Sequence, residues 1–394
     1  MLDEVLVKCE RLDNFGRGVS KVGGKVIFVP DLFPGEVALV RITIDKKKFM
    51  VGEVISLKEK SKDRIISKCP YDKCGCAFKN LNYEKTLVYK KEKVLDLLKR
   101  FGNIDIKNVE IVSSQNIYNY RNKITLKVKN GKIGYFKNGS NDLIEIDKCM
   151  LASERTNEII GILKKEDLSC VREVIIKDMD EVMISIDGDM DISNLKSYAD
   201  SIYLNEKCVY GKEKIINSLF EYKFLVSKDS FFQVNKDVTL KLYSKVLEYA
   251  GSGEKAVDLY CGTGTISILL SKFFDSVSGI EINSEAVLCA NENKELNNIN
   301  NVSFKCGDAN KLVKGMSADV IVVDPARAGL MDLGIKNILE IKPKKIVYVS
   351  CDPVTLSRDL KELNKYYDVK DVTLFDMFPF TYHVECVCLL CKIN

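Results

Sequence analysis

The chain has 394 residues, room for two or three domains of about 100 to 200 residues each, and 46% of its residues are hydrophobic, enough to fill their cores. The net charge is only +4, so no overall charge imbalance indicates a nucleic-acid partner, and any basic surface must be local. The first residues contain no basic segment leading into an apolar run, and no later stretch reaches the roughly 18 apolar residues of a membrane span. We therefore expect a cytoplasmic protein that does not cross a membrane.

The cysteine and histidine counts limit the chemistry further. There are 14 cysteines and a single histidine, His383. In a long chain without a signal peptide, cysteines are more often buried, catalytic or metal-bound than paired in disulfides. One histidine excludes a mechanism built on a histidine cluster. The chemistry must therefore depend on Cys, Asp and Glu.

Residues 1–58 have the pattern of a small β-barrel. Short runs of β-branched and aromatic residues alternate with Gly- and Pro-containing turns, and the predicted strands are Val5 to Cys9, Gly24 to Pro30, Glu36 to Ile44 and Phe49 to Leu57. Three lysines precede Phe49, a combination that suits phosphate contact and base stacking, although such a run is more often a solvated turn.

Residues 59–229 are predicted to form a central mixed α/β domain. A cysteine-rich segment, Cys69 to Cys76, is followed by apolar residues at helical spacing over Tyr83 to Phe101. The polar face of that helix is mainly basic, which fits either phosphate contact or a solvated surface. Lys129-Asn-Gly131 then separates two strand patterns and predicts a β-hairpin.

Residues 230–394 give the clearest fold prediction. Apolar strand patterns, most of them separated by helix-length segments, occur at Ala256 to Leu259, Val277 to Ile280, Val302 to Lys305, Val320 to Val323, Ile346 to Val349, Val372 to Phe375 and Val384 to Leu390. This alternation is typical of an α/β fold with a parallel, doubly wound, Rossmann-like sheet.

A glycine-rich turn follows the first of these strands. Gly262 and Gly264 lie between Asp258 and a helix predicted over Thr265 to Phe274, where backbone amides can approach a ligand closely. A nicotinamide dinucleotide is one candidate ligand, but the third glycine of that fingerprint is replaced by Ser267.

Three acidic residues end the following strands and favour a different ligand. Glu281 is suited to accept the ribose hydroxyls, Asp308 lies where an adenine amino group is expected, and Asp324 precedes Pro325 at the end of the fourth strand. This series suits an adenosine that carries a cationic sulfonium and no phosphates. We therefore predict that the cofactor is S-adenosylmethionine.

Two reactive residues complete the predicted site. Cys351 follows the fifth strand at the same sheet edge, and Glu385 lies just inside the last strand. A thiolate that adds to carbon 6 of a pyrimidine makes carbon 5 nucleophilic enough to accept a methyl group, and a carboxylate can then remove the carbon 5 proton. Cys351 is thus the predicted nucleophile and Glu385 the predicted base, acting on a base that is unstacked or flipped.

The chain resembles the RNA uracil-5-methyltransferase family, bacterial enzymes that make 5-methyluridine in 23S ribosomal RNA and in tRNA. The matching motifs are Ser230-Phe-Phe-Gln-Val-Asn235, the glycine turn, Asp324-Pro-Ala-Arg-Ala-Gly-Leu330, Ser350-Cys-Asp-Pro-Val-Thr-Leu-Ser-Arg-Asp359 and Asp376-Met-Phe-Pro-Phe-Thr-Tyr-His-Val-Glu385. The resemblance implies a TRAM domain, an OB-like RNA-binding barrel, at residues 1–58. It implies the same roles for Cys351 and Glu385, cofactor contacts by Gln233, Tyr260, Glu281 and Asp324, and Arg121 near the target base.

The resemblance also implies a [4Fe-4S] cluster. Its ligands would be Cys69, Cys74, Cys76 and Cys149. The two spacings between Cys69, Cys74 and Cys76 are each one residue shorter than in the family pattern. A tighter loop of thiolates can still reach three irons. A four-cysteine zinc site is the alternative, and thiols without a metal are a third possibility.

Other functions fit less well. An RNA cytosine-5-methyltransferase keeps a cysteine where this chain has Ala326, and a non-catalytic iron–sulfur RNA-binding protein would have lost Cys351 or Glu385. The barrel and the cysteine segment favour 23S ribosomal RNA as the substrate, with tRNA as the alternative. Nothing in the sequence requires more than a monomer.

Overall fold

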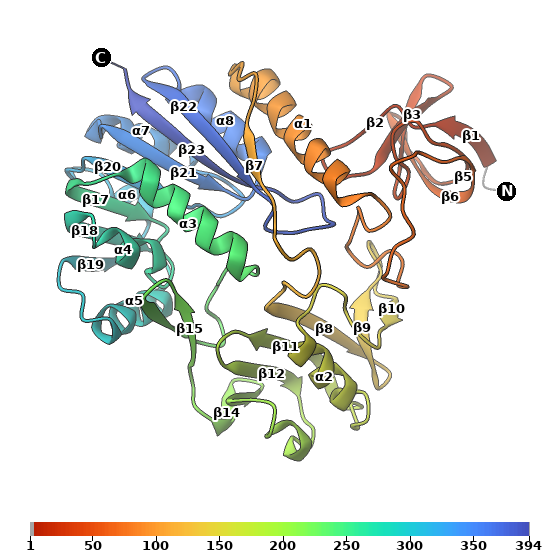
Figure 1. Ribbon diagram of the computed structural model, residues 1–394, viewed down its shortest axis with the longest axis horizontal. Coiled ribbons are helices and arrows are strands. Elements are labelled where there is room, and N and C mark those ends of the chain that lie inside the picture. Colours follow the sequence, from red (N-terminus) through yellow and green to blue (C-terminus); the bar gives the residue numbers. More distant parts are fainter. Residues whose placement is uncertain (1–3, 394) are drawn as a thin grey trace. The chain divides into compact units, whose positions relative to one another are not determined.

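The computed structural model describes residues 4–393, which fold into two compact units (Figure 1). The first unit comprises residues 4–93, 136–144 and 378–383, and the second comprises residues 94–135, 145–377 and 384–393. The chain therefore returns to the first unit twice after leaving it. The three domains expected at residues 1–58, 59–229 and 230–394 stay a prediction.

A six-stranded curled sheet forms the N-terminal part of the first unit. Its order is β1-β5-β6-β4-β3-β2, with β1 (Glu4–Lys8), β2 (Arg11–Leu12), β3 (Gly18–Val22), β4 (Lys25–Val29), β5 (Val37–Asp45) and β6 (Phe49–Glu59). Three register shifts between β5 and β6 bend the sheet, and β1 also lies close to β3. The inward side chains, including Ile27, Val40 and Met50, form a buried core. The small β-barrel is confirmed.

The central sheet has seven strands in the order β10-β9-β8-β11-β12-β13-β14. Their bounds are β8 (Lys123–Lys129), β9 (Lys132–Phe136), β10 (Leu143–Glu145), β11 (Val171–Asp178), β12 (Val182–Gly188), β13 (Ser201–Leu204) and β14 (Lys207–Gly211). The predicted hairpin joins β8 and β9, and both Asn130 (φ 54°) and Gly131 (φ 73°) are left-handed, as its turn requires. Helices α1 (Tyr83–Gly102) and α2 (Glu154–Leu163), the turn η1 (Ser193–Leu195) and the hairpin of β15 (Ile215–Leu219) and β16 (Tyr222–Val226) lie in the same stretch of the sequence.

An eight-stranded sheet forms the core of the second unit. The order is β19-β18-β17-β20-β21-β23-β22-β7, with β7 (Glu110–Val112), β17 (Gly253–Leu259), β18 (Phe274–Glu281), β19 (Val302–Cys306), β20 (Val320–Val323), β21 (Lys345–Ser350), β22 (Tyr367–Phe375) and β23 (Glu385–Lys392). Strands β17 to β21 are parallel, as predicted, but β23 runs antiparallel to both of its neighbours. The reason is that β22 and β23 are joined by a loop, residues 376–384, and not by the crossover helix that a parallel connection requires.

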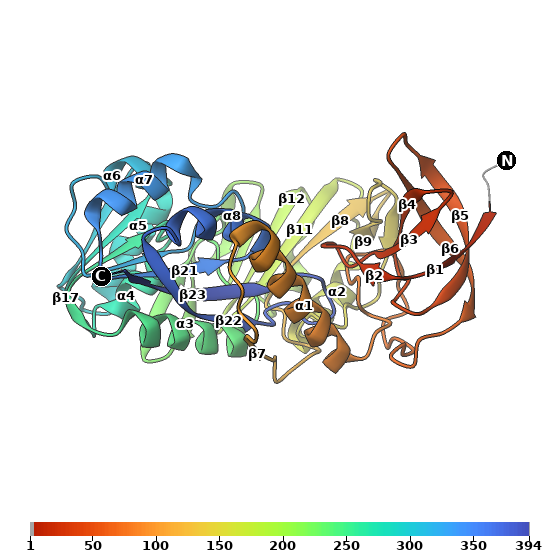
Figure 2. The same ribbon diagram turned by 90° about the horizontal axis from the view of Figure 1, so that it is seen from above.

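Helices cover both faces of this sheet. Figure 2 shows α3 (Lys236–Ala250) and α4 (Thr265–Leu270) on one face, with α6 (Ala309–Leu312) and α7 (Met331–Ile341) on the other. Helix α5 (Ser284–Leu296) packs beside β18 and β19, and α8 (Pro353–Leu363) packs against α7. The helix predicted over Thr265 to Phe274 ends at Leu270, because Phe274 already begins β18.

The core of the sheet includes residues from the early part of the chain. Val94 and Leu98 of α1 belong to the same buried cluster as Ile346 and Leu374. Strand β7 pairs in parallel with β22 at the sheet edge. Among residues 4–393, no helix combines the length and the apolar character needed to span a membrane.

Candidate active site

The glycine turn after β17 has the conformation that close approach to a ligand requires. Gly262 and Gly264 have φ angles of 54° and 81°, and Tyr260 is also left-handed with φ 65°. A Cβ on Gly264 would lie 2.6 Å from the ring of Phe304, whereas a Cβ on Gly262 would have no heavy atom within 4 Å. The turn is therefore packed on one side and open on the other.

Glu281 lies directly across this turn. One of its carboxylate oxygens accepts a hydrogen bond from the Gly262 amide at 3.1 Å, and the other accepts from the Asn283 amide at 2.8 Å. The structure thus brings together two residues that were predicted to bind the cofactor. These bonds orient the carboxylate at the end of β18.

Tyr260 and Asp308 meet around a residue that the sequence analysis missed. The Tyr260 hydroxyl donates to Oδ1 of Asn310 at 2.6 Å, and Oδ1 of Asp308 accepts from the Asn310 amide at 3.0 Å as the N-cap of α6. The only sequence signal for Asn310 was its position just after a strand-end acid. Asn310 therefore links two predicted cofactor contacts, Tyr260 and Asp308.

Asp258 provides the test of whether these residues suit the predicted cofactor. Its side chain is fully buried, one carboxylate oxygen accepts from Ser267 Oγ at 2.6 Å, and the other has no hydrogen-bond partner in the described part of the chain. Burial raises the pKa of Asp258 to about 7. An unpaired buried acceptor beside an open glycine turn fits a ligand that brings donors and positive charge. The residues therefore suit S-adenosylmethionine.

The predicted nucleophile and base lie on paired strands. Strands β21 and β23 are antiparallel with Ser350 opposite Cys386, so Cys351 and Glu385 are the next positions along the two strands. Glu385 is 3% exposed, and Cys351 is partly buried. Asp324 ends the neighbouring strand β20. Three predicted functional residues thus share one edge of the sheet.

Burial and mutual repulsion shift the pKa values of this group. Burial raises the pKa of Glu385 to about 8, and the charge of Asp324 contributes in the same direction. Burial also raises the pKa of the Cys351 thiol to about 11, with Glu385 and Asp324 adding to the effect. The guanidinium of Arg327 opposes both shifts, and burial raises the pKa of Asp324 to about 6. Arg327 was not identified from the sequence, although it lies within the Asp324 motif.

Helix α8 holds the loop that carries Asp324 and Arg327. The buried carboxylate of Asp359 accepts from the Leu330 amide at 2.8 Å and from the Tyr348 hydroxyl at 2.7 Å. Arg358 donates to the carbonyl of Ala328 at 2.7 Å. The last two residues of the Cys351 motif therefore fix the neighbouring loop.

Gln233 and Arg121 lie on segments that pair with each other. The Asn122 side chain donates to the Gln233 carbonyl at 3.2 Å, and the Asn122 amide donates to the Val234 carbonyl at 3.0 Å. Arg121 forms an isolated antiparallel bridge with Asn235. The predicted base contact and one predicted cofactor contact are therefore neighbours in the second unit.

A buried lysine fixes the turn that precedes Gln233. The Lys177 ammonium donates to the carbonyls of Ser227, Lys228 and Ser230 at 2.8, 2.7 and 2.9 Å. Burial lowers the pKa of Lys177 to about 7. A lysine inside a strand gave no sequence signal for this role, because its partners are backbone atoms of a distant turn.

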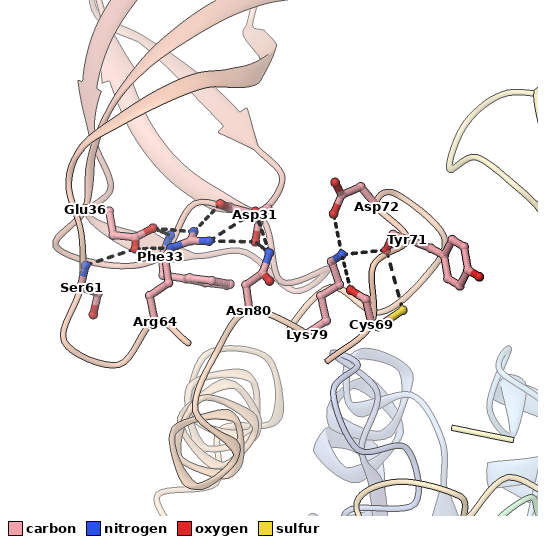
Figure 3. A network of polar contacts seen from close by, with 10 residues as sticks. All are labelled: Asp31, Phe33, Glu36, Ser61, Arg64, Cys69, Tyr71, Asp72, Lys79 and Asn80. Atoms are coloured by element: carbon pink, nitrogen blue, oxygen red, sulfur yellow. Dashed lines mark hydrogen bonds and ion pairs between the residues drawn. The ribbon is translucent and has the colours of Figure 1, made fainter. Parts of the chain in front are cut away.

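The cysteine loop, residues 69–76, is organised around an ammonium group (Figure 3). Lys79 Nζ donates to the carbonyls of Cys69 and Tyr71 at 3.3 and 2.7 Å and pairs with Asp72 at 2.5 Å. The thiols of Cys69 and Cys74 both contact the Tyr71 carbonyl, at 3.9 and 3.8 Å. Two thiols therefore turn toward one backbone oxygen, beside a positive charge.

The structure does not support the predicted metal centre. In the part of the chain that the structure describes, no group of three or more His, Cys, Asp or Glu side chains is arranged to hold a metal ion. Cys149 belongs to the second unit, where its amide and carbonyl bond to the Asn157 side chain, whereas Cys76 belongs to the first. Neither the [4Fe-4S] cluster nor the zinc alternative therefore gains support.

Comparison with known proteins gives matches along the whole chain. Residues 186–393 match the model of the tRNA (uracil-5-)-methyltransferase family, and residues 3–55 match the TRAM domain. An uncharacterised RNA methyltransferase of Clostridium acetobutylicum is 35% identical, over 97% of this chain and 95% of its own length. Another, from Halalkalibacterium halodurans, is 34% identical over 98% and 97%.

A solved structure also matches nearly the whole chain. The tRNA (uracil-54, C5)-methyltransferase of Pyrococcus abyssi, in complex with S-adenosyl-L-homocysteine, superposes with a TM-score of 0.82 at 30% identity, covering 98% of this chain and 100% of that one. The predicted fold, an N-terminal TRAM barrel with an S-adenosylmethionine-dependent methyltransferase domain, is confirmed. With the glycine turn, the strand-end acids and these matches, the chain belongs to the tRNA (uracil-5-)-methyltransferase family of RNA-modifying enzymes.

Proposed function

We propose that this protein methylates carbon 5 of a uracil base in RNA through a covalent bond between Cys351 and carbon 6 of the base. The observation that supports this most directly is the register of β21 and β23, which ends with Ser350 opposite Cys386, so that Cys351 and Glu385 are the next residues beyond that pair. Asp324 and Arg327 act electrostatically on both side chains. A thiol and a carboxyl in one site are the two groups that the reaction needs.

The cofactor site in this proposal comprises Gln233, Tyr260, Gly262, Glu281, Asp308 and Asp324. S-adenosylmethionine, when bound there, supplies an electrophilic methyl group. The carboxylates of Glu281 and Asp308 are already oriented by backbone amides, so they lose little conformational entropy when they accept hydrogen bonds from a ligand.

The protein residues carry the remaining chemistry. The Cys351 thiol must first release its proton to solvent water, and the nearby Arg327 guanidinium favours the thiolate. The sulfur then bonds to carbon 6, the electron pair moves to carbon 5, and carbon 5 accepts the methyl group. Glu385 removes the remaining carbon 5 proton, and breakage of the carbon–sulfur bond restores the ring and the thiolate. The target base must leave its stack, and we propose that Arg121 contacts it.

We propose 23S ribosomal RNA as the substrate. The proposal is supported by the barrel and the cysteine loop, which the sequence shares with enzymes of that branch. The Pyrococcus abyssi enzyme favours tRNA as a second candidate, because it is a tRNA methyltransferase whose structure matches 98% of this chain. Both RNAs must therefore be tested together.

The decisive experiment incubates the purified protein with S-adenosylmethionine and either unmodified 23S ribosomal RNA or tRNA transcripts, followed by nucleoside analysis. We expect 5-methyluridine in the ribosomal RNA. The Cys351→Ala variant should make no product while it still binds S-adenosylhomocysteine, which serves as the control for folding. Product from Cys351→Ala, or 5-methylcytidine from the wild type, would contradict the mechanism. If 5-methyluridine forms only in tRNA, the substrate is tRNA and not 23S ribosomal RNA.

The predicted [4Fe-4S] cluster has no part in these steps. It can be tested separately by measuring iron, acid-labile sulfide and zinc in protein purified without oxygen. Iron and sulfide in equal amounts would restore the prediction from the resemblance, and zinc alone would favour the alternative. A protein that methylates RNA without either would show that the reaction needs neither a cluster nor zinc.

A further inference from the structure

A continuous row of aromatic rings, with one arginine guanidinium between two of them, runs through the first unit. We call it the stacking row, and it consists of Phe49, Phe28, Arg17, Phe15, Tyr382 and His383. The rings of Phe49 and Phe28 are 6.0 Å apart between centroids. The Arg17 guanidinium carbon lies 4.5 Å from the ring centroid of Phe28 and 5.4 Å from that of Phe15. Each step is within the usual range for aromatic and cation–π contacts.

The row continues from the barrel to the segment just before Glu385. The ring centroids of Phe15 and Tyr382 are 5.8 Å apart, and those of Tyr382 and His383 are 4.2 Å apart. His383 is the only histidine in the chain, and it precedes the proposed base by two residues. The barrel and this C-terminal segment therefore contribute to one surface of the first unit.

The barrel end of the row is fixed before any ligand binds. Asp13 accepts from Nε of Arg17 at 2.8 Å, and its other oxygen accepts from the amides of Arg17 and Phe15 at 2.8 and 2.9 Å. These bonds hold the guanidinium plane between the two phenylalanine rings. Gly16 has φ 74°, and a Cβ there would lie 2.7 Å from Phe78 and 3.3 Å from Tyr382. Only glycine permits this close approach.

Lysines of α1 fix the other end. Lys90 Nζ donates to the carbonyl of Phe378 at 3.0 Å, and Lys93 Nζ donates to that of Tyr382 at 2.5 Å. The Lys93 ammonium also lies 5.8 Å from the centroid of the Tyr382 ring. Both ends of the row thus have a restrained backbone.

Two rings of the row are more exposed than rings that only pack against one another. Phe15 is 57% exposed and Phe49 is 39% exposed. Three exposed lysines, Lys46 to Lys48, directly precede Phe49 in the chain. Exposed aromatic faces next to ammonium groups are the combination that binds single-stranded nucleic acid, since bases stack on the rings while cations contact the backbone. A duplex hides its base faces and cannot use such a surface.

We propose that the stacking row is a platform for unpaired bases of the RNA strand that flank the target uridine, with the exposed faces of Phe15 and Phe49 as the main contacts. This rests on the proposed function, because it takes the RNA substrate as the ligand. It adds that the substrate is recognised as a single strand, by base stacking along the row.

Binding of a short single-stranded RNA that contains the fluorescent base 2-aminopurine tests the platform. Phe15→Leu and Phe49→Leu keep apolar volume but remove the ring face, and Phe220→Leu is a matched control, because Phe220 is 41% exposed and lies in the second unit. We expect each row variant to weaken binding between about 5-fold and about 150-fold and to reduce the stacking-dependent quenching. The control should bind like the wild type.

The salt dependence separates stacking from phosphate contact. Loss of a stacked base should weaken binding without changing the slope of log affinity against log salt, whereas loss of a phosphate contact lowers that slope. Unchanged affinity, a lower slope, or an equal loss with duplex RNA would each overturn the platform. The assay needs no methyl transfer, so an inactive protein that still shows the Phe15 effect would overturn the proposed reaction and leave the platform standing. The circular dichroism spectrum and the urea unfolding midpoint verify that every variant is folded.

Discussion

Replacing Glu385 with glutamine should stabilise the fold at high pH while it stops turnover. The carboxyl is 3% exposed, and burial together with the charge of Asp324 raises its pKa from 4.5 to about 8. At pH values between these two pKa values, the Glu385 carboxyl is protonated in the folded protein and ionised in the unfolded chain. The free energy of unfolding of the wild type therefore falls as the pH rises through this window.

The size of the effect follows from the two pKa values. Each pH unit in the window changes the free energy of unfolding by about 1.4 kcal/mol, and the slope vanishes above the folded-state pKa. Glu385→Gln has a similar shape and cannot ionise. We therefore expect the variant to gain about 3 kcal/mol over the wild type when the pH is raised from about 6 to about 9. Urea unfolding followed by circular dichroism measures this difference, with Glu340→Gln, an exposed change on α7, as the control.

The same variant tests the proposed base. Without a group to take the carbon 5 proton, the methylated uracil should remain bonded to Cys351, and a covalent protein–RNA complex should persist on a denaturing gel. If the stability of Glu385→Gln ran parallel to that of the wild type across this pH range, the argument from burial would be refuted. Free turnover at the wild-type rate would refute the role as base.

Two paired comparisons test other parts of the structure. Arg64→Met should lower the free energy of unfolding by about 3 to 5 kcal/mol, because it leaves the fully buried Glu36 carboxylate without its partner at 2.6 Å, whereas Arg41→Met breaks an exposed ion pair worth less than about 1 kcal/mol. Equal urea midpoints for the two variants would contradict this. Gly264→Ala should lower the free energy of unfolding, measured in urea, more than Gly262→Ala, because only at Gly264 would the added Cβ meet a neighbour, at 2.6 Å. The opposite order would show that the turn packs differently.

The methyltransferase strands could be predicted because each is an apolar run with a polar residue at its end. Val320 to Val323 is the clearest case, since its predicted and observed bounds are identical. Strands β2, β3 and β7 escaped prediction because they are short or rich in Gly, Ser and Lys, and long-range pairing determines them. The end of α4 at Leu270 was missed because Leu269, Leu270, Phe273 and Phe274 continue an apolar pattern that fits a helix as well as a strand.

Some residues of the site could likewise be identified from the sequence, and others could not. Gly262 and Glu281 could be paired from sequence because parallel strands end at one edge of a sheet, and their hydrogen bond bears this out. Asn310, Arg327 and Lys177 could not be identified, because each acts through a tertiary contact that no local pattern encodes. The roles predicted for Cys351 and Glu385 await the experiments above.

The parallel pairing of β7 with β22 affects how this enzyme folds during synthesis and where it can be truncated. Strand β7 is synthesised before the central sheet, whereas β22 and β23 emerge near the other end of the sequence, so the nascent chain must keep an unpaired strand available until translation is almost finished. A catalytic module transplanted from residue 230 onward would leave β22 with an open edge, the kind of edge that recruits other chains and aggregates. A usable graft would have to carry residues 94–112 with it.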